Sequence, residues 1–262
     1  MDKHYNTLLT ELNPDGILRI TLNRPDRLNA LSRELLDDLH AVIQNAASES
    51  RVKGLLLTGA GKAFSAGADI QQLAQVDAQT GLEFAKRGQA VFWALENLGK
   101  PSIAAINGFA FGGGCELALS ATIRIAAEAA TFGQPEVKLG VIPGYGGTQR
   151  LARLVGKGRA LDLCLTGRFI STKDALQWGL ITEVTAPQDL IPHAEMILKG
   201  IIDQGPLAVR SVMAVIQSGY DLPLAEALHL EAVHFALTCA SRDKQEGVSA
   251  FLEKRKPDFK GE

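Results

Sequence analysis

Two glutamates in the middle of the chain could transfer protons. Glu116 is the only charged residue between Lys100 and Arg124, and Glu136 follows in the segment Phe132-Gly-Gln-Pro-Glu-Val. A carboxyl group in such an apolar stretch loses solvation, which raises its pKa toward the range useful for proton transfer. The structural alternative is that Glu116 caps or ion-pairs the helix that begins beside it. The two residues taken alone leave both interpretations open.

A run of three glycines, Gly112-Gly113-Gly114, stands directly before the predicted helix that carries Glu116. Without Cβ atoms the backbone can turn sharply, and its N–H groups can approach a ligand near the positive end of the helix. A second turn of small residues, Ser65–Asp69, follows the apolar run Val52–Leu57. Two converging N–H donors beside two carboxyl groups could stabilise a thioester enolate and move protons around it. A plain strand-to-helix turn is the alternative for the glycine run.

Three ordered segments closely resemble the crotonase superfamily and, more narrowly, the enoyl-CoA hydratases. They are Phe64-Ser-Ala-Gly-Ala-Asp-Ile, Asn107-Gly-Phe-Ala-Phe-Gly-Gly-Gly-Cys-Glu-Leu-Ala and Phe132-Gly-Gln-Pro-Glu-Val-Lys-Leu-Gly-Val-Ile-Pro-Gly-Tyr-Gly-Gly-Thr-Gln-Arg-Leu. The resemblance runs from Asn23-Arg-Pro to Ala250-Phe-Leu-Glu-Lys-Arg, so it covers nearly the whole chain. It implies an α/β fold: a crotonase-type spiral of ββα repeats over residues 1–200, holding the acyl-CoA site, and a C-terminal helical region over 201–262 for trimerisation and CoA contact.

The resemblance also implies a role for each matching residue. The N–H groups of Ala68 and Gly113 would form an oxyanion hole for the acyl thioester oxygen, and Gly144 would help to place the water. Glu116 would be the base that activates this water, and Glu136 the acid that serves C2. Coenzyme A contacts are expected from Arg24, Arg27, Ala66, Asp69, Ile70, Phe251 and Lys254, the last two reaching the CoA of a neighbouring subunit. Thr122 and Gln71 depart from the family pattern, which often has aspartate and lysine at these positions.

The implied reaction is the addition of water across the trans-2 double bond of an enoyl-CoA thioester, giving 3-hydroxyacyl-CoA, in fatty acid β-oxidation or related acyl-CoA metabolism. Two adjacent carboxyl groups resist holding two negative charges, so one should stay protonated near neutral pH. The residues do not decide which one. An enoyl-CoA isomerase or another crotonase-type enzyme is the alternative, but an isomerase usually lacks one of the two carboxylates. A CoA- or RNA-binding protein with incidental turnover is a third hypothesis.

No separate cofactor and no metal are implied, because coenzyme A is part of the substrate. The five histidines never stand three or four positions apart, which argues against a metal site on one helix face. The resemblance further implies a homo-oligomer, either a trimer or a dimer of trimers, which is a homohexamer.

Composition and charge argue against several other classes of protein. The 262 residues include 27 basic and 29 acidic side chains, a net charge of −2 that gives no strong field for nucleic acid or anionic lipid. The three cysteines indicate reduced thiols rather than a disulfide frame. The first twelve residues include Asp2 and Glu11 and no long apolar run, unlike a secretory signal. We therefore expect a cytoplasmic protein that binds neither nucleic acid nor membrane.

The hydrophobic pattern predicts the elements that must position these residues. Alternating apolar residues predict a strand over Gly16–Leu22, and Ser32 is a plausible N-cap for a helix whose apolar face runs from Leu35 to Ala46. With a buried strand over Val52–Leu57, this order predicts a βαβ unit. Helix and strand then alternate over Phe84–Leu98, Ser102–Ile106, Glu116–Ala121 and Thr122–Ala126. From Gly156 onward the pattern is mostly helical, ending with Pro223–Ala240 and Asp243–Lys256.

Overall fold

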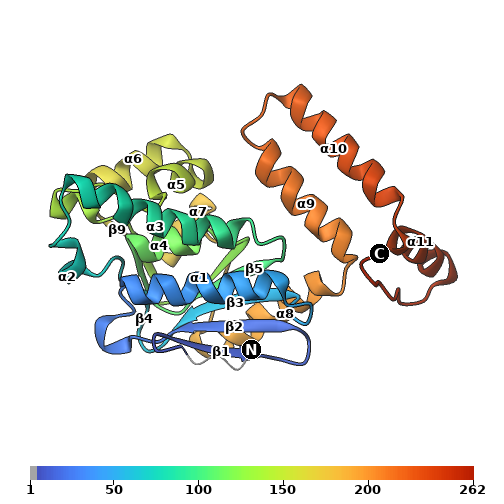
Figure 1. The fold of residues 1–262 in the computed structure, drawn as a ribbon, viewed down its shortest axis with the longest axis horizontal. Coiled ribbons are helices and arrows are strands. Elements are labelled where there is room, and N and C mark those ends of the chain that lie inside the picture. The colour runs from blue at the N-terminus through green and yellow to red at the C-terminus, as the bar shows by residue number, and fades with distance from the viewer. Residues whose placement is uncertain (1–4) are drawn as a thin grey trace.

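The computed structural model describes residues 5–262. Residues 1–4, which include Asp2 and were predicted to begin the core, lie outside the described residues. Figure 1 shows an α/β core and, extending away from it, an arm of C-terminal helices. Within residues 5–262 no helix combines the length and the apolar character that crossing a membrane requires.

The larger sheet has six strands in the order β1-β2-β3-β5-β7-β10. β1 pairs antiparallel with β2, whereas every other neighbouring pair is parallel. All residues of β5 are buried, as are all but the last of β3, which is the pattern of a sheet covered on both faces. The strands are β1 (Leu8–Leu12), β2 (Ile17–Leu22), β3 (Gly54–Gly59), β5 (Ser102–Ile106), β7 (Ile123–Ala127) and β10 (Glu183–Thr185).

The smaller sheet has four strands of three residues each, in the order β4-β6-β8-β9. They are β4 (Ala63–Ser65), β6 (Phe109–Phe111), β8 (Thr131–Gly133) and β9 (Phe169–Ser171). β4, β6 and β8 each follow a strand of the larger sheet after a short turn, and a helix follows each of them. This repeated strand–strand–helix order confirms the predicted spiral of ββα units.

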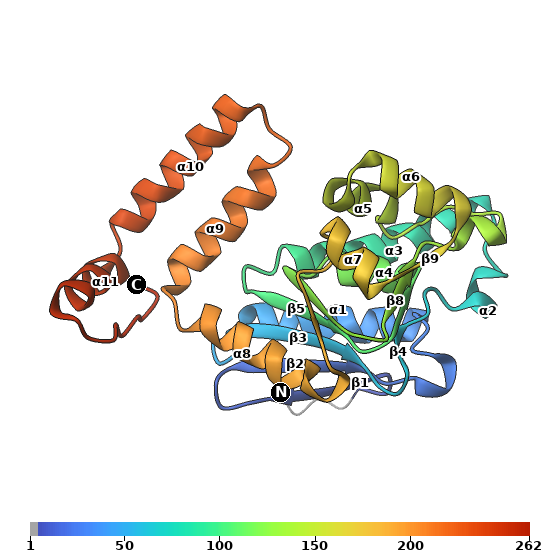
Figure 2. The same cartoon turned by 180° about the vertical axis from the view of Figure 1, so that it is seen from behind.

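Helices cover the larger sheet on both faces, as Figures 1 and 2 show from opposite sides. On one face lie α1 (Arg33–Ser48), α3 (Ala78–Glu96) and α4 (Gly113–Leu119), around a core that includes Phe64, Phe92 and Phe132. On the other lies α8 (Leu190–Ile202), whose residues Leu190, Ala194 and Leu198 join Leu56 and Ile103 in a second core. Their spacing of four residues places the three side chains on one face of α8.

The remaining helices connect the strands or build the arm. The connecting helices are η1 (Pro25–Arg27), α2 (Ile70–Leu73), η2 (Glu136–Leu139), α5 (Gly147–Val155), α6 (Lys157–Thr166), α7 (Thr172–Trp178) and η3 (Pro187–Asp189). The arm consists of α9 (Pro206–Gly219), α10 (Leu224–Cys239) and α11 (Arg242–Glu253), with α9 and α10 packed together as a hairpin. The division of the chain into functional regions 1–200 and 201–262 stays a prediction.

The βαβ unit is confirmed, since β2 and β3 are parallel neighbours and the Ser32 side chain accepts a hydrogen bond from Leu35 N at the start of α1. The helix predicted from Phe84 begins earlier, at Ala78, because Asp77 and Thr80 form a capping box. The helix predicted from Glu116 also begins earlier, inside the glycine run. The mostly helical interpretation of the chain after Gly156 overlooks β9 and β10, which are too short to show alternation.

Candidate active site

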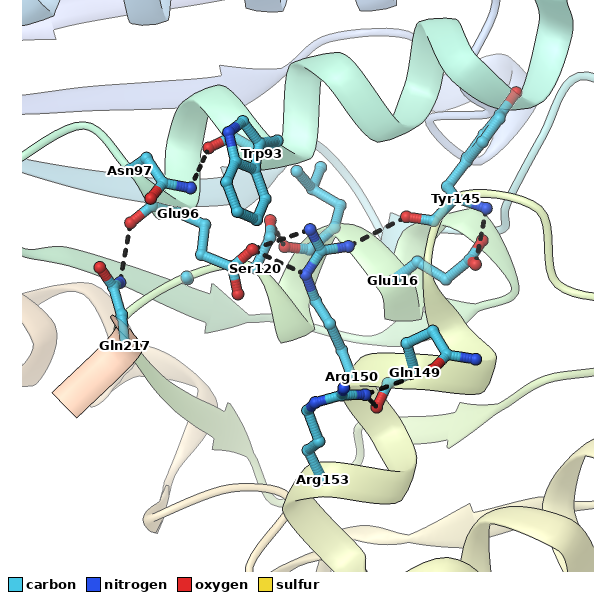
Figure 3. Close-up of polar contacts among 12 residues, drawn as sticks. Trp93, Glu96, Asn97, Glu116, Ser120, Tyr145, Gln149, Arg150, Arg153 and Gln217 are labelled. Atoms are coloured by element: carbon cyan, nitrogen blue, oxygen red, sulfur yellow. Dashed lines mark hydrogen bonds and ion pairs between the residues drawn. The ribbon is translucent and has the colours of Figure 1, made fainter. Parts of the chain in front are cut away.

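Glu116 lies in the first turn of α4 and is 1% exposed. Its Oε1 accepts hydrogen bonds from two backbone N–H groups, those of Tyr145 at 2.8 Å and Gly147 at 2.6 Å. Figure 3 shows Tyr145 beside Glu116, on the loop that leads into α5. A β-carbon on Gly147 would lie 2.9 Å from Glu116 Oε1, so only glycine allows the backbone this close. The two donors therefore fix the orientation of the carboxyl group.

Glu136 is the first residue of η2 and lies against the glycine turn. A β-carbon on Gly112 would lie 2.6 Å from Glu136 Oε1. Gln134 is fully buried beside it, and when the amide nitrogen of Gln134 faces Glu136 it donates to both carboxylate oxygens at 3.2 Å. The Gln134 amide also lies against Gly147, where a β-carbon would meet it at 2.8 Å. Because Gly147 and Gln134 link the surroundings of Glu116 to those of Glu136, the two carboxyl groups converge on one small region.

Burial shifts the titration of both carboxyl groups. It raises the pKa of Glu116 to about 8, with a further upward contribution from the charge of Glu136 and an opposing one from the two N–H donors. Burial likewise raises the pKa of Glu136 to about 7. Because the two groups interact, these values describe the pair, which titrates near neutral pH. The pair can therefore carry one proton and one negative charge, the state that combines an acid with a base.

The two predicted oxyanion-hole positions lie on adjoining turns. Gly113 is the first residue of α4, and no side chain caps this helix start. Leu31 and Ala68 form a parallel β-bridge, in which Leu31 N donates to Gly67 O at 2.8 Å and Asp69 N donates to Leu31 O at 3.1 Å. Both bonds use the neighbours of Ala68 and not Ala68 itself, so the Ala68 N–H points away from Leu31. Across residues 5–262, no hydrogen bond uses the N–H of Ala68 or Gly113. A β-carbon on Gly67 would lie 3.4 Å from Gly113 N, so the turns meet here.

Most of the predicted CoA-binding residues gather around the turn before α2. Arg24 donates to Asp69 Oδ2 through both terminal nitrogens at 3.1 Å, and Asp69 also caps α2 through Gln71 N. Ala66 N donates to Leu28 O, which attaches this turn to the segment that begins with η1. The structure thus brings Arg24, Arg27, Ala66, Asp69 and Ile70 to neighbouring turns, with Arg27 and Ile70 exposed.

Two predicted residues lie far from the glutamates of the same chain. Phe251 is on α11 and is 82% exposed, and Lys254 is the C-cap residue of that helix. Figures 1 and 2 both place α11 at the far end of the arm. Their contact with the CoA of a neighbouring subunit stays a prediction. Gly144, by contrast, directly precedes Tyr145, and its carbonyl accepts a hydrogen bond from Gln89 Nε2 at 2.8 Å.

Several residues of the site were not predicted from the sequence. The backbone donors of Tyr145 and Gly147 and the amide of Gln134 lie within the third family-like segment, and the glycine at 147 was the one available signal for close approach. Thr122, where the family often has aspartate, is hydrogen-bonded to Ser102. Its hydroxyl accepts from Ser102 N at 3.1 Å, and Thr122 N donates to Ser102 Oγ at 3.0 Å.

Comparison with known proteins agrees with this geometry along nearly the whole chain. The profile of the family described as Enoyl-CoA hydratase/isomerase matches residues 13–262. The crotonyl-CoA hydratase of Syntrophomonas wolfei is 44% identical over 256 residues, 97% of this chain and 98% of that protein. The short-chain-enoyl-CoA hydratase of Clostridium acetobutylicum is 44% identical over 238 residues, 90% of this chain and 91% of that protein. The crystal structure of enoyl-CoA hydratase from Bacillus anthracis has a TM-score of 0.95 at 39% identity, covering 98% of this chain and 100% of that one. The chain belongs to the enoyl-CoA hydratase/isomerase family.

Proposed function

We propose that the protein is an enoyl-CoA hydratase, a hydro-lyase that adds water across the trans-2 double bond of an enoyl-CoA thioester to give 3-hydroxyacyl-CoA. The observation that carries this proposal is the convergence of two buried carboxyl groups, Glu116 and Glu136, beside the adjoining turns of Ala68 and Gly113. The relatives named crotonyl-CoA hydratase and short-chain-enoyl-CoA hydratase support the same reaction. The presence of both carboxyl groups favours hydration over isomerisation, which needs only one base.

In this proposal the N–H groups of Ala68 and Gly113 donate to the thioester oxygen. Negative charge grows on that oxygen when a nucleophile adds at C3, because the enolate delocalises it. Backbone donors that are already in place and shielded from water stabilise this charge without reorganising. The uncapped start of α4 adds the positive end of a short run of aligned peptides.

Proton transfer is divided between the two carboxyl groups. The ionised Glu116 takes a proton from water as the water oxygen bonds to C3, and the protonated Glu136 delivers its proton to C2. Water is thereby added without any net change in the protons that the pair holds. Burial raises the pKa of Glu116 to about 8 and that of Glu136 to about 7, values that belong to the coupled pair, so we assign the ionised role on geometry: Glu116 is the carboxyl group that accepts hydrogen bonds from two backbone N–H donors, and such bonds favour the charged form. We assign Gly144 to the water because it adjoins Tyr145, a donor to Glu116.

The finer assignments also belong to this proposal. The names of the relatives favour a short acyl chain, and the reaction fits fatty acid β-oxidation or a related acyl-CoA pathway in the cytoplasm. The exposed Ile70 side chain offers an apolar surface for the adenine of CoA, and the exposed Arg27 supplies charge for its phosphates. Arg24 would contribute from its ion pair with Asp69. The arm would assemble the chain as a trimer or a dimer of trimers, bringing Phe251 and Lys254 to a neighbouring site. No separate cofactor or metal takes part.

The test is turnover of crotonyl-CoA, followed by the loss of ultraviolet absorbance as the conjugated double bond is hydrated. We expect rapid loss with the wild type and at least about a hundredfold slower loss with Glu136→Gln or Glu116→Gln, the usual scale for an acid–base group. Glu128→Gln, at an exposed glutamate, is the matched control and should keep the wild-type rate. Absence of hydration by a wild type that still binds the thioester would reject the proposal and make a 3-enoyl-CoA the next substrate to test.

A further inference from the structure

The backbone of Tyr145, which holds Glu116, is itself held at its carbonyl group. Tyr145 N donates to Glu116 Oε1 at 2.8 Å, and Tyr145 O accepts a hydrogen bond from Arg150 Nη1 at 3.0 Å. Glycines flank this residue on both sides, and Gly146 has a φ of +114°. Glycine-flanked loops have unusual backbone freedom, so an ordered position for the two donors to Glu116 needs contacts from outside the loop.

Arg150 supplies such a contact, and each of its three side-chain nitrogens donates a hydrogen bond. Its side chain on α5 is largely buried, and Nε and Nη2 donate to Glu96 Oε2 at 3.1 and 2.8 Å. The third direction, through Nη1, reaches Tyr145 O, as Figure 3 shows. The guanidinium group also packs on Gly146, where a β-carbon would lie 2.3 Å from Nη1. A planar guanidinium group fixes these partners in one geometry, which an ammonium group cannot do.

Glu96 is in turn fixed by its place in the fold. It is the last residue of α3, and its backbone carbonyl accepts a hydrogen bond from Gln217 Nε2 of α9 at 2.8 Å. Figure 3 shows this chain of contacts from Gln217 through Glu96 and Arg150 to Tyr145 and Glu116. A chain of contacts from α9 through the end of α3 and Arg150 of α5 thus ends at the loop that orients Glu116.

We propose that Arg150 is a positioning residue for hydration: it fixes the Tyr145 backbone so that the N–H groups of Tyr145 and Gly147 keep Glu116 aimed at the reacting water, and Glu96 holds Arg150 in place. This inference rests on the role of Glu116 in the proposed function. Arg150 acts through the loop backbone, and its positive charge also favours the ionised form of Glu116 by lowering the pKa of that carboxyl group.

The same helix offers a matched control. Arg153 is one turn further along α5, is about half exposed, and pairs with Asp221 through Nε at 3.2 Å. Its other bonds go to Gln149, which makes no contact with Glu116 among the hydrogen bonds of the described chain. Removing Arg153 therefore removes a guanidinium group and an ion pair from α5 while leaving the Tyr145 backbone held.

The experiment compares Arg150→Met, Arg150→Lys, Glu96→Gln and Arg153→Met with the wild type, measuring kcat and KM for crotonyl-CoA across pH. Since a small misplacement of a catalytic group costs about 10- to 100-fold in rate, we expect Arg150→Met to lower kcat at least tenfold while KM changes less than about threefold. The acidic limb of the pH profile of kcat should move to higher pH in Arg150→Met, because this variant lacks the positive charge that favours the Glu116 carboxylate. Arg150→Lys and Glu96→Gln should show smaller losses of kcat, and Arg153→Met should stay within twofold of the wild type.

An Arg150→Met enzyme with the kcat and pH profile of Arg153→Met overturns the inference, and so does a loss confined to KM. If Arg150→Met does not fold, Arg150→Lys and Glu96→Gln decide the matter: a lowered kcat at unchanged KM in both supports the inference, and wild-type kcat in either one overturns it. Infrared titration of the buried carboxyl groups, with Glu116→Gln identifying the band of Glu116, needs no turnover. It shows whether Arg150→Met moves the Glu116 titration even if the wild type fails to hydrate crotonyl-CoA, and so separates this inference from the proposed function.

Discussion

Gly112 and Glu136 approach so closely that a β-carbon at position 112 would lie 2.6 Å from Glu136 Oε1. The same glycine has a φ of +50°, a conformation that disfavours other residues. Glycine at position 112 therefore matters for two separate reasons: it allows this backbone conformation, and it leaves the Glu136 carboxyl group in place, which a β-carbon would push aside. The steric reason concerns the site alone, because the atom in the way is the carboxylate oxygen of the proposed acid.

These two reasons can be separated with Gly140, which has a φ of +74° and no atom within 4 Å of the place that a β-carbon would occupy. Alanine costs about 1–2 kcal/mol of backbone strain at Gly140, which is left-handed helical, and more at Gly112, whose ψ of −124° lies outside that region. We expect both substitutions to lower the melting temperature, Gly112→Ala by more. Only Gly112→Ala should displace Glu136, and it should lower kcat at least about tenfold, on the scale of a misplaced catalytic group. Equal losses of kcat in the two variants would show that strain, and not the contact with Glu136, sets the rate.

The sequence predicted the position and burial of Glu116, because an apolar segment with one charged residue packs in the core and carries that residue with it. It could not predict the donors that hold this carboxyl group. The N–H of Tyr145 comes from 29 residues away, and a backbone donor has no side chain to mark it in the sequence. The same limit applies to Arg24, whose pairing with Asp69 joins residues that are 45 positions apart.

The two sheets differ in the same way in how far the hydrophobic pattern could predict them. The unit β2–α1–β3 could be predicted, since its strands are long enough to show burial and its helix has both a cap and a periodic apolar face. The smaller sheet could not, because three residues are too few to establish a period of two. Those short strands are nevertheless what carry the turns of Ala68 and Gly113 to the same place.

The raised pKa values of the two glutamates predict a bell-shaped dependence of kcat/KM on pH. Below about 7 both carboxyl groups hold protons and no base remains, whereas above about 8 both are ionised and no acid remains. The singly protonated pair is most populated between these values, so the maximum should lie there. Initial rates of crotonyl-CoA hydration from about pH 5 to about pH 10 would test this. A profile that is flat across this whole range would contradict a mechanism with one acid and one base.

The same shift has a consequence for stability. The pKa of Glu136 is raised from 4.5 to about 7 on folding, so the folded state binds this proton more tightly than the unfolded state does. The stability that this protonated group provides is present below pH 4.5 and is lost as the pH rises through about 7. Glu136→Gln removes the ionisable group, so at about pH 8.5 the variant should be more stable than the wild type by on the order of 1–3 kcal/mol.

Urea unfolding at about pH 8.5 and at about pH 5 measures this difference. At the lower pH the difference should be much smaller, because Glu136 is protonated and neutral in the folded wild type and this pH lies only slightly above the unfolded pKa of 4.5. Glu128→Gln, at an exposed glutamate, should show no such pH-dependent gain. A gain of the same size for Glu136→Gln at both pH values would trace its stability to packing and not to the titration of Glu136.

The arm predicts how the chain assembles. Leu224, Phe235 and Leu237 on α10 are each more than 60% exposed in the single chain, and exposed apolar surface of this kind marks a contact with another protein. We expect light scattering to give the mass of a trimer or hexamer for the wild type and a smaller mass for Phe235→Asp, because a buried unpaired charge opposes association. Lys157→Asp, which changes an exposed charge on α6, should keep the wild-type mass.

If Phe251 and Lys254 contact the CoA of a neighbouring subunit, Phe235→Asp should also raise KM for crotonyl-CoA, and Phe251→Ala should raise KM without changing the mass. A Phe251→Ala enzyme with wild-type KM would remove this residue from the CoA site.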